Sequence, residues 1–567
     1  MPYRAPVSEL RFILDHVAGF ARVVATDRFA QATPDLVEAI LTEGGRLASE
    51  VLAPLNRVGD QTPARLQDGA VVSSPGYAEA YRALAEGGWV GIAASADHGG
   101  MGLPFTLALA VDDMLSGACL ALQLKPLLSK GQIEALEHHA SDAVKALYLP
   151  KLISGEWSGT MNLTEPQAGS DVGALKTRAV PNGDGTHAIS GEKIFITWGD
   201  SDLVANVCHL VLARLPDAAP GTRGISLFMV PKAIPDAEGN PGRPNSLRVD
   251  RLEHKLGIHG SPTCVMRFDG ATGWLVGEPG KGMAAMFTMM NNARLSVAAQ
   301  GVGVAEAALQ QALAYAQDRR QGVTPLSADG PIVDHADVRR MLAVARAQVF
   351  AARAIALHCA VAGDMAKATG DAGWQARAAF LTPIAKAFCT DTACEVAHQG
   401  VRVHGGTGFV EQTGAAQFLR DARILPIYEG TNGIQAMDLV GRKLADGGAA
   451  AFRLIDEVLA ATDAARAALP DLAAPLAQAA AALRQATVSL LDLPPNDRFA
   501  GATAYLRAFA LILGSQAHLV AALADPDRLP LARVMIGRLL PDHASLLATA
   551  RLGAADLYAV SVAGLGG

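Results

Sequence analysis

The amino-acid sequence predicts an α+β fold in which helices predominate. Residues 8–22 and 34–52 place apolar side chains at helical spacing, with polar residues between them. Residues 160–280 instead contain short β-rich runs separated by turns. Long helical patterns return at 283–444, and the 567 residues are enough for several domains. We therefore expect a small β domain between helical regions of the sequence.

The first expected domain, residues 1–157, is helical, with a loop rich in Gly, Pro, Asp and Ser at 60–75. Residues 105–124 are apolar but contain Asp112 and Asp113, so we expect no membrane span. These aspartates lack histidine partners at ligand spacing, and we expect no metal site. The first residues show no signal-peptide pattern, which favours a cytoplasmic location.

The second expected domain, residues 158–280, is the β domain. The turn at 182–185, with the sequence Asn-Gly-Asp-Gly, has the composition of a tight connection. The candidate strands are residues 188–197, 203–214, 224–231 and 262–268.

The third expected domain, residues 281–446, is a helical bundle, and the fourth, residues 447–567, is an appended all-α domain. Gly447 and Gly448 have the composition of a joint between the two. The chain beyond this joint is rich in alanine and leucine and is interrupted by prolines, which indicates several helices.

The composition excludes some classes of protein. Half of the residues are hydrophobic and 18% are charged, which is typical of a globular protein. The net charge of -7 gives no general attraction to nucleic acid or to an anionic membrane. Residues 451–567 contain no lysine, which disfavours a nucleic-acid surface there. The six cysteines include no C-x-x-C pair, as expected in a reducing compartment.

Glu429 is the candidate catalytic acid. It lies between Tyr428 and Gly430, just before a predicted helix with Asn432 as its N-cap and Gln435 three residues later. Partial burial beside an aromatic ring would raise the pKa of a carboxylate toward that of a general base. The helix N-terminus would oppose that shift. A solvated glutamate in an N-terminal turn is the alternative.

A cofactor site requires residues other than the usual glycine motifs, because the sequence contains neither an early G-x-G-x-x-G nor a Walker loop. In residues 161–171, proline and glycine shape a loop, while Thr164 and Ser170 supply hydroxyls. Residues 195–197 add an aromatic edge and a further hydroxyl. This mixture suits a flavin ring, although an ordinary strand is the alternative for 195–197.

Residues 428–431, 403–409 and 161–171 resemble the acyl-CoA dehydrogenase family, in the family's order and spacing. The resemblance covers nearly the whole chain, including the region after residue 450. It implies an N-terminal helical domain, a middle β-barrel or sandwich and a C-terminal helical bundle, with the all-α domain appended. Residues 253–263 and 430–435 are similar to the branch that contains 3-methylmercaptopropionyl-CoA dehydrogenases.

The resemblance implies FAD-dependent α,β-dehydrogenation of an acyl-CoA to the trans-2-enoyl-CoA. Glu429 would remove the α-proton and flavin N5 would accept the β-hydride. A short or medium acyl-CoA is expected, with 3-(methylthio)propanoyl-CoA as one candidate. Electron-transfer flavoprotein is the expected electron acceptor. An acyl-CoA oxidase, which uses O₂, and a homologue that binds nucleic acid or protein through its C-terminal domain are the alternatives.

The resemblance also implies the site residues. Thr164 would bond the flavin ring, Thr197 would lie near N5, and Arg319 would reach the pyrophosphate of a neighbouring subunit, so a dimer or tetramer is expected. The cofactor-binding residues implied are Met161, Asn162, Leu163, Thr164, Gly169, Ser170, Phe195, Ile196, Thr197, Arg319, Arg402, Gly405, Gly406, Thr431 and Asn432. The substrate-binding residues implied are Ser170, Asn291, Arg294, Tyr428 and Gly430.

Four positions depart from the family pattern. Phe195 replaces a tryptophan, and Arg402 and Ala336 each replace a glutamine, which puts the contacts between subunits in doubt. Ala293 stands where some relatives have the catalytic acid, which supports Glu429 as the base. For Arg294, a charge on the helix surface is the alternative to a substrate contact.

Overall fold

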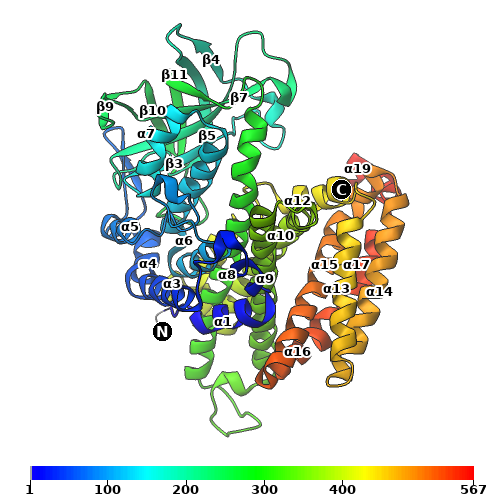
Figure 1. The fold of residues 1–567 in the computed structure, drawn as a ribbon. Coiled ribbons are helices and arrows are strands. Elements are labelled where there is room, and N and C mark those ends of the chain that lie inside the picture. The colour runs from blue at the N-terminus through cyan, green and yellow to red at the C-terminus, as the bar shows by residue number, and fades with distance from the viewer. Residues whose placement is uncertain (1–2, 567) are drawn as a thin grey trace. The chain divides into compact units, whose positions relative to one another are not determined.

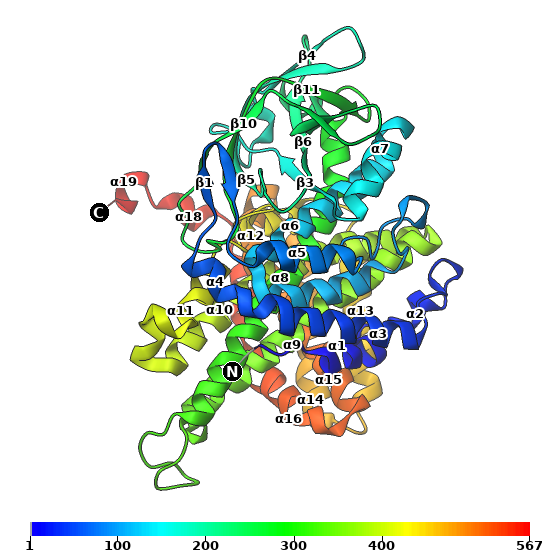
Figure 2. The ribbon, with the colours of Figure 1, turned by 90° about the vertical axis from the view of Figure 1, so that its left-hand side faces the viewer.

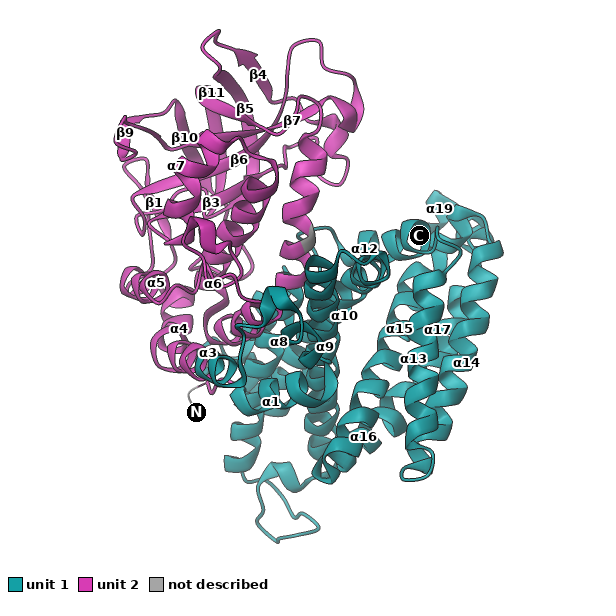
Figure 3. Ribbon diagram, in the orientation of Figure 1, with its two compact units in different colours: residues 1, 6–41, 297–567 teal, residues 2–5, 42–296 magenta. Residues whose placement is uncertain are grey.

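The computed structural model describes residues 3–566, apart from the side chain of Asn291, and forms two compact units (Figure 3). Unit 2 contains residues 42–296 and includes the whole β domain. Unit 1 combines residues 6–41 with the chain from residue 297 onward. Unit 1 is therefore assembled from two segments that are far apart in the sequence.

The main sheet of unit 2 has seven strands and closes on itself. Its order is β10-β11-β5-β4-β6-β3, and β7 pairs with both β6 and β11. The strands are β3 (Trp157–Asn162), β4 (Arg178–Pro181), β5 (His187–Thr197), β6 (Asn206–Arg214), β7 (Ile225–Pro231), β10 (Leu247–Leu252) and β11 (Thr263–Val276). Buried residues such as Val211, Phe228 and Phe268 fill the core. The four candidate strands are confirmed, while β3, β4 and β10 were missed.

Two short hairpins accompany this sheet. They are β1 (Arg65–Gln67) with β2 (Ala70–Val72), and β8 (Ala233–Pro235) with β9 (Pro241–Pro244). The first lies where the sequence predicts only a loop. Its turn residues, Asp68 and Gly69, both have positive φ, at 51° and 80°. This Asp-Gly pair is the usual signature of a two-residue hairpin turn, so the loop prediction was wrong.

Four α-helices of the described chain lie wholly within unit 2. They are α4 (Ala53–Gln61), α5 (Tyr77–Glu86), α6 (Phe105–His139) and α7 (Asp142–Ile153), and α3 (Pro34–Arg46) spans the boundary with unit 1. Helix α6 is buried along most of its length and kinks at Cys119, whose φ and ψ are −157° and 88°. The buried Asp112 is paired with Lys130 at 2.6 Å. The carboxylate of Asp112, which interrupts the apolar run, is thus ion-paired inside the protein.

The regular elements of unit 1, among its described residues, are all helices. Its first part contains α1 (Val7–Phe12) and α2 (Ala21–Val24), and its core contains α8 (Gly282–Asp318), which begins in unit 2, α9 (Ala336–Thr369), α10 (Ala372–His404), α11 (Ala415–Ala422) and α12 (Asn432–Asp438). The loop between α8 and α9 projects beyond the ends of both helices (Figures 1 and 2).

The C-terminal part of unit 1 forms a further helical layer (Figure 1). Its helices are α13 (Ala449–Ala465), α14 (Pro470–Asp492), α15 (Pro495–Ala524), α16 (Leu529–Val534), α17 (His543–Ala550), α18 (Ala555–Ala559) and α19 (Val562–Leu565). Helix α15 packs against α9, and the ring of His518 contacts the carbonyl oxygen of Ala347 at 3.0 Å. Gly447 and Gly448, the predicted joint, have positive φ values of 72° and 79°.

Three helices are long and apolar enough to cross a membrane by length and composition alone: α6, α9 and α15. The sequence argument that Asp112 and Asp113 make α6 too polar to cross a membrane was therefore wrong. In their most apolar windows, 94%, 83% and 78% of the residues, respectively, are buried inside the protein. They are core helices of the fold rather than membrane spans.

Candidate active site

The turn that carries Glu429 has a strained and well-supported backbone. Glu429 has a φ of 54° and Gly430 a φ of 85°, so both lie in the left-handed region. The backbone N–H of Asn432 donates to the carbonyl oxygen of Pro426 at 2.9 Å and closes the turn. A residue other than glycine in this conformation costs about 1 kcal/mol, and such strain is concentrated at functional sites.

Lys386, on α10, holds this turn in place. Its buried ammonium group donates to the carbonyl oxygen of Gly430 and to Oδ1 of Asn432, both at 2.9 Å. The amide of Asn432 in turn donates to Asp391 Oδ1 at 2.8 Å. Helix α10, which precedes the turn by about forty positions, therefore holds the backbone that follows Glu429.

The helix that follows begins differently from the prediction. The N-cap of α12 is Thr431, whose hydroxyl accepts from the backbone N–H of Ile434 at 3.2 Å. The expectation that Asn432 caps this helix was wrong. Asparagine is usually the better N-cap, but the side chain of Asn432 is already bonded to Lys386 and Asp391.

Tyr428 lies beside the acid and is half-buried. Its hydroxyl donates to Gln300 Oε1 on α8. Burial, with the nearby Glu429 carboxylate, raises the pKa of the Tyr428 phenol well above its usual value. The phenol is therefore protonated at all ordinary pH values, and it contributes a neutral wall beside Glu429.

The segment predicted to face a flavin lies in unit 2, where β3 ends. Met161, Leu163 and Thr164 are half-buried, and Asn162 is fully buried. Further along, Gly169 and Ser170 are exposed, and a Cβ added at Gly169 would meet no atom within 4 Å. The hydroxyls and the open glycine are thus present along one short loop.

The end of β5 contributes the aromatic residue of this region. Phe195 is 60% exposed and has a φ of 61°, whereas the neighbouring Ile196 is buried and Thr197 is half-buried. An exposed phenylalanine held in a left-handed conformation is unfavourable on both counts. Together with the half-buried hydroxyls of Thr164 and Thr197, it fits a surface shaped to contact a flat aromatic ligand.

Sequence reasoning missed the residue that holds this loop. Glu165 is buried, and its carboxylate accepts hydrogen bonds from Lys193, at 2.8 Å, and from the backbone and hydroxyl of Thr177. Burial alone would raise the pKa of Glu165, but the charge of Lys193 and the hydrogen bonds lower it to about 2. Lys193 also donates to the carbonyl oxygen of Leu163 at 2.9 Å. No spacing pattern links residues 165 and 193, so only the fold reveals the pair.

The residues predicted to hold a pyrophosphate lie in unit 1. Arg319, at the end of α8, and Arg402, in α10, are exposed. The rings of Tyr315 and His404 stack at 4.4 Å, which brings the end of α8 next to the turn containing Gly405, whose φ is 62°. Gly406 is exposed in the same turn. These exposed guanidinium groups and the open turn fit the phosphate part of a dinucleotide.

Two predicted substrate residues lie on α8. Arg294 is only 7% exposed, so its alternative assignment as a charge on the helix surface was wrong. Ala293, beside it, is buried. The side chain of Asn291 lies outside the described residues. Within the described part of the chain, no group of three or more His, Cys, Asp or Glu side chains could hold a metal ion.

Three family models match the chain in sequence order. They represent the acyl-CoA dehydrogenase N-terminal domain at residues 63–156, the middle domain at 160–271 and the C-terminal domain at 280–445. A curated relative, 3-methylmercaptopropionyl-CoA dehydrogenase from Ruegeria pomeroyi, is 48% identical over 520 residues. That alignment covers 89% of this chain and 88% of the relative.

Solved structures agree with this fold. Caenorhabditis elegans ACDH-11 in complex with C11-CoA has a TM-score of 0.80 at 19% identity, covering 95% of this chain and 92% of that one. An acyl-CoA dehydrogenase from Bacillus anthracis complexed with FAD has a TM-score of 0.73 at 19% identity, covering 97% and 92%. At this identity the two structures support the fold alone.

The matched domains and the fold define a flavoprotein oxidoreductase. The chain belongs to the acyl-CoA dehydrogenase family, in which FAD is the cofactor. The expected fold class and family are therefore confirmed. The roles of the individual site residues and the four-domain boundaries stay predictions.

Proposed function

We propose that this protein catalyses α,β-dehydrogenation of a short or medium acyl-CoA, with 3-(methylthio)propanoyl-CoA as its first candidate substrate. The observation that carries the proposal is the 48% identity, over 89% of the chain, to a relative named for that substrate. Electron-transfer flavoprotein is the proposed acceptor, in the cytoplasm, and the protein is proposed to act as a homodimer or homotetramer.

Glu429 is proposed as the base that removes the α-proton. The α-carbon of a thioester is a weak acid, so its deprotonation needs both a carboxylate and hydrogen-bond donors at the thioester oxygen. Glu429 offers its carboxylate and its own backbone N–H, and the strained turn fixes the direction of both. The anchor from Lys386 to Gly430 supports this role because it resists relaxation of the turn.

FAD, when bound, would supply the hydride acceptor. The residues proposed to hold it are Thr164 and Thr197 at the ring, with Phe195 packing against it, and the Arg319 guanidinium at the pyrophosphate. The buried Glu165–Lys193 pair supports this assignment because it fixes the loop that carries Thr164. These residues bind and orient, whereas Glu429 moves the proton.

The test is an anaerobic titration of the purified holoenzyme with acyl-CoAs from propanoyl to palmitoyl, including the methylthio compound, while flavin absorbance is recorded. Pentanoyl-CoA is the matched control, because its C4 methylene stands in the position of the sulfur atom with little change of shape. We expect rapid bleaching by 3-(methylthio)propanoyl-CoA and slower bleaching by pentanoyl-CoA. A holoenzyme that no acyl-CoA bleaches would contradict the proposal. Repeating the reaction in air separates a dehydrogenase from an oxidase.

A further inference from the structure

A cavity of about 360 Å³ lies within unit 1 and shares no residue with the predicted active site. Residues 17–22 of the N-terminal segment form one wall, and helices α9 and α10 form another. Helices α13 and α15 of the appended region complete it. The cavity therefore exists only because both ends of the chain pack on the central helices.

The polar lining of the cavity carries a net positive charge. Arg22, Arg377 and His358 line it together with a single carboxylate, that of Glu457. Arg377 Nη1 donates to Glu457 Oε1, which neutralises one arginine. Arg22 forms no ion pair with any residue that the structure describes. One positive charge in the cavity is thus left for an incoming anion.

The positive charges of Arg22 and Arg377 also act on the ring of His358. Burial, together with the charges of Arg377 and Arg22, lowers the pKa of the His358 ring to about 3. The ring is therefore neutral at pH 7 and provides one hydrogen-bond donor and one acceptor. An anion between the arginines would meet a donor from His358 without gaining or losing a proton there.

The rest of the lining is apolar. Val17, Val361 and Val520 contribute aliphatic surface, and Trp374 contributes a ring whose centroid lies 5.7 Å from Cζ of Arg377. A bare inorganic anion would leave this surface in contact with water. A ligand with an apolar part would cover it, at a gain of about 25 cal/mol for each Å² buried.

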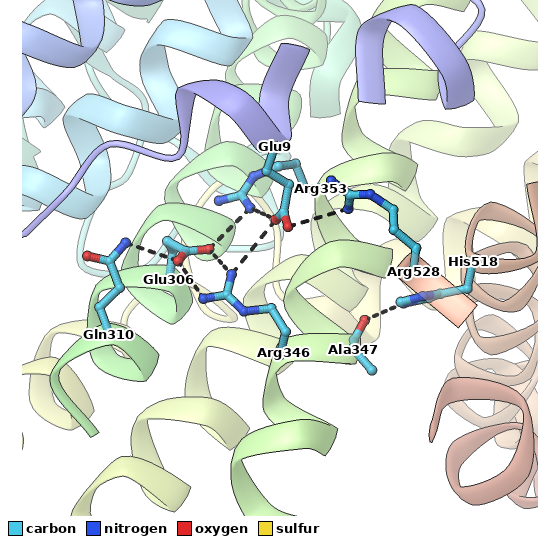
Figure 4. Close-up of polar contacts among 8 residues, drawn as sticks. All are labelled: Glu9, Glu306, Gln310, Arg346, Ala347, Arg353, His518 and Arg528. Carbon is cyan, nitrogen blue, oxygen red and sulfur yellow. Dashed lines mark hydrogen bonds and ion pairs between the residues drawn. The ribbon is translucent and has the colours of Figure 1, made fainter. Parts of the chain in front are cut away.

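The N-terminal wall is held in place by charged contacts, so the cavity is preformed. Glu9 pairs with the buried Arg353, whose guanidinium also lies 3.2 Å from Glu306 (Figure 4). Arg528, from the C-terminal region, lies 3.9 Å from Glu9 and 3.7 Å from the ring centroid of Phe12. A ligand that enters would therefore not have to order this segment first.

We propose that this cavity binds a small organic anion, with its carboxylate or phosphate between Arg22 and Arg377 and its apolar part against the valines. The proposal does not depend on the active site, because the cavity residues and the predicted catalytic residues are separate. It gives the appended region a binding role in addition to its packing.

The test is isothermal titration of the FAD-loaded protein with hexanoate and with hexyl phosphate, which distinguish the two head groups. Inorganic phosphate tests binding of the anionic head group alone, and hexan-1-ol tests binding of the apolar chain without the charge. We expect at least one of the two amphipathic anions to bind more tightly than either partial probe. Arg22 is exposed, and we expect the substitution Arg22→Gln to raise the dissociation constant about tenfold. This factor corresponds to the free energy of one charge-assisted hydrogen bond.

Arg28→Gln is the matched control, since Arg28 is an exposed arginine in the same N-terminal region but does not line the cavity. It should leave the affinity unchanged. Binding that Arg22→Gln does not weaken would place the ligand elsewhere, for example at the acyl-CoA site, and would overturn the proposal. The absence of binding by both amphipathic anions, or equally tight binding of inorganic phosphate, would also overturn it.

Discussion

At the scale of single residues, Glu165 and Glu429 differ in how their carboxylates are held. Glu165 is buried and accepts several hydrogen bonds, so its carboxylate is fixed in the ionised form. Glu429 lies half-buried on a turn whose backbone, rather than its carboxylate, is held by Lys386. The sequence could single out Glu429 from its neighbours. It could not single out Glu165, because the partner that defines its role is 28 positions away.

Glu429→Gln should keep the backbone of the turn and remove the proton acceptor. We expect this variant to bind FAD and acyl-CoA normally but to reduce the flavin at least about 100-fold more slowly, the lower range for loss of a general base. Stopped-flow absorbance with the best substrate of the panel measures this rate. Glu429→Asp, which suits a left-handed φ, should retain partial activity. A Glu429→Gln enzyme that turns over normally would disprove the assignment.

At the scale of elements, sequence patterns located the strands that are long and apolar. Strands β5, β6 and β7 are flanked by turns and could be predicted from residue type alone. Strand β4 has only four residues, and charged residues make up half of β10, so neither has a clear local signal. The start of α12 shows the same limit, because contacts made through Lys386 override local capping preference.

The loop after β3 should depend on the Glu165–Lys193 pair. Glu165→Gln removes the charge while keeping the side-chain shape, and it leaves Lys193 buried without its counter-ion. We expect the dissociation constant for FAD to rise at least about tenfold, which corresponds to about 1.4 kcal/mol. Fluorescence titration of the apoprotein with FAD measures this change.

Glu192→Gln is the control for that experiment. It removes a neighbouring carboxylate of β5 that pairs with Arg267 near the surface. FAD affinity should stay unchanged, since exposed ion pairs contribute little. Equal weakening in both variants would mean that charge in general, rather than the buried pair, supports the site.

At the scale of the whole molecule, unit 1 is joined internally by a buried charge network. Glu306 accepts from Arg346 at 2.8 Å and from Arg353 at 3.2 Å, and Arg353 continues to Glu9 (Figure 4). Burial would raise the pKa of Glu306, but the charges of Arg346 and Arg353 outweigh it and lower the pKa to about 2. The network links α1, α8 and α9, which no local pattern in the sequence could connect.

This network should make the protein sensitive to acid. Because the pKa of Glu306 is lowered on folding, its stabilising contribution is complete above about pH 4.5 and is lost as the pH falls toward about 2. We expect the melting temperature to fall steeply over that window. Glu306→Gln should destabilise the protein by about 3 kcal/mol at pH 7 and flatten the acid-dependent fall.

Glu43→Gln serves as the control for the acid experiment, because Glu43 pairs with Arg46 on the surface. Its melting curve should match that of the unmodified protein at every pH. Thermal unfolding followed by circular dichroism from pH 7 to pH 2 compares the three proteins. Identical acid profiles for the Glu306 variant and the unmodified protein would show that other carboxylates control acid unfolding.

The division of unit 1 between the two ends of the chain bears on its synthesis. Residues 6–41 belong to the same compact unit as residues beyond 297, and Glu9 faces Arg528. During translation the N-terminal helices leave the ribosome long before their partners exist, and domains generally fold as their segments become complete. Residues 42–296 can therefore fold while the polypeptide is still growing. Residues 6–41 can complete their folding only after the C-terminal helices of unit 1 have been synthesised, and until then they are accessible to chaperones.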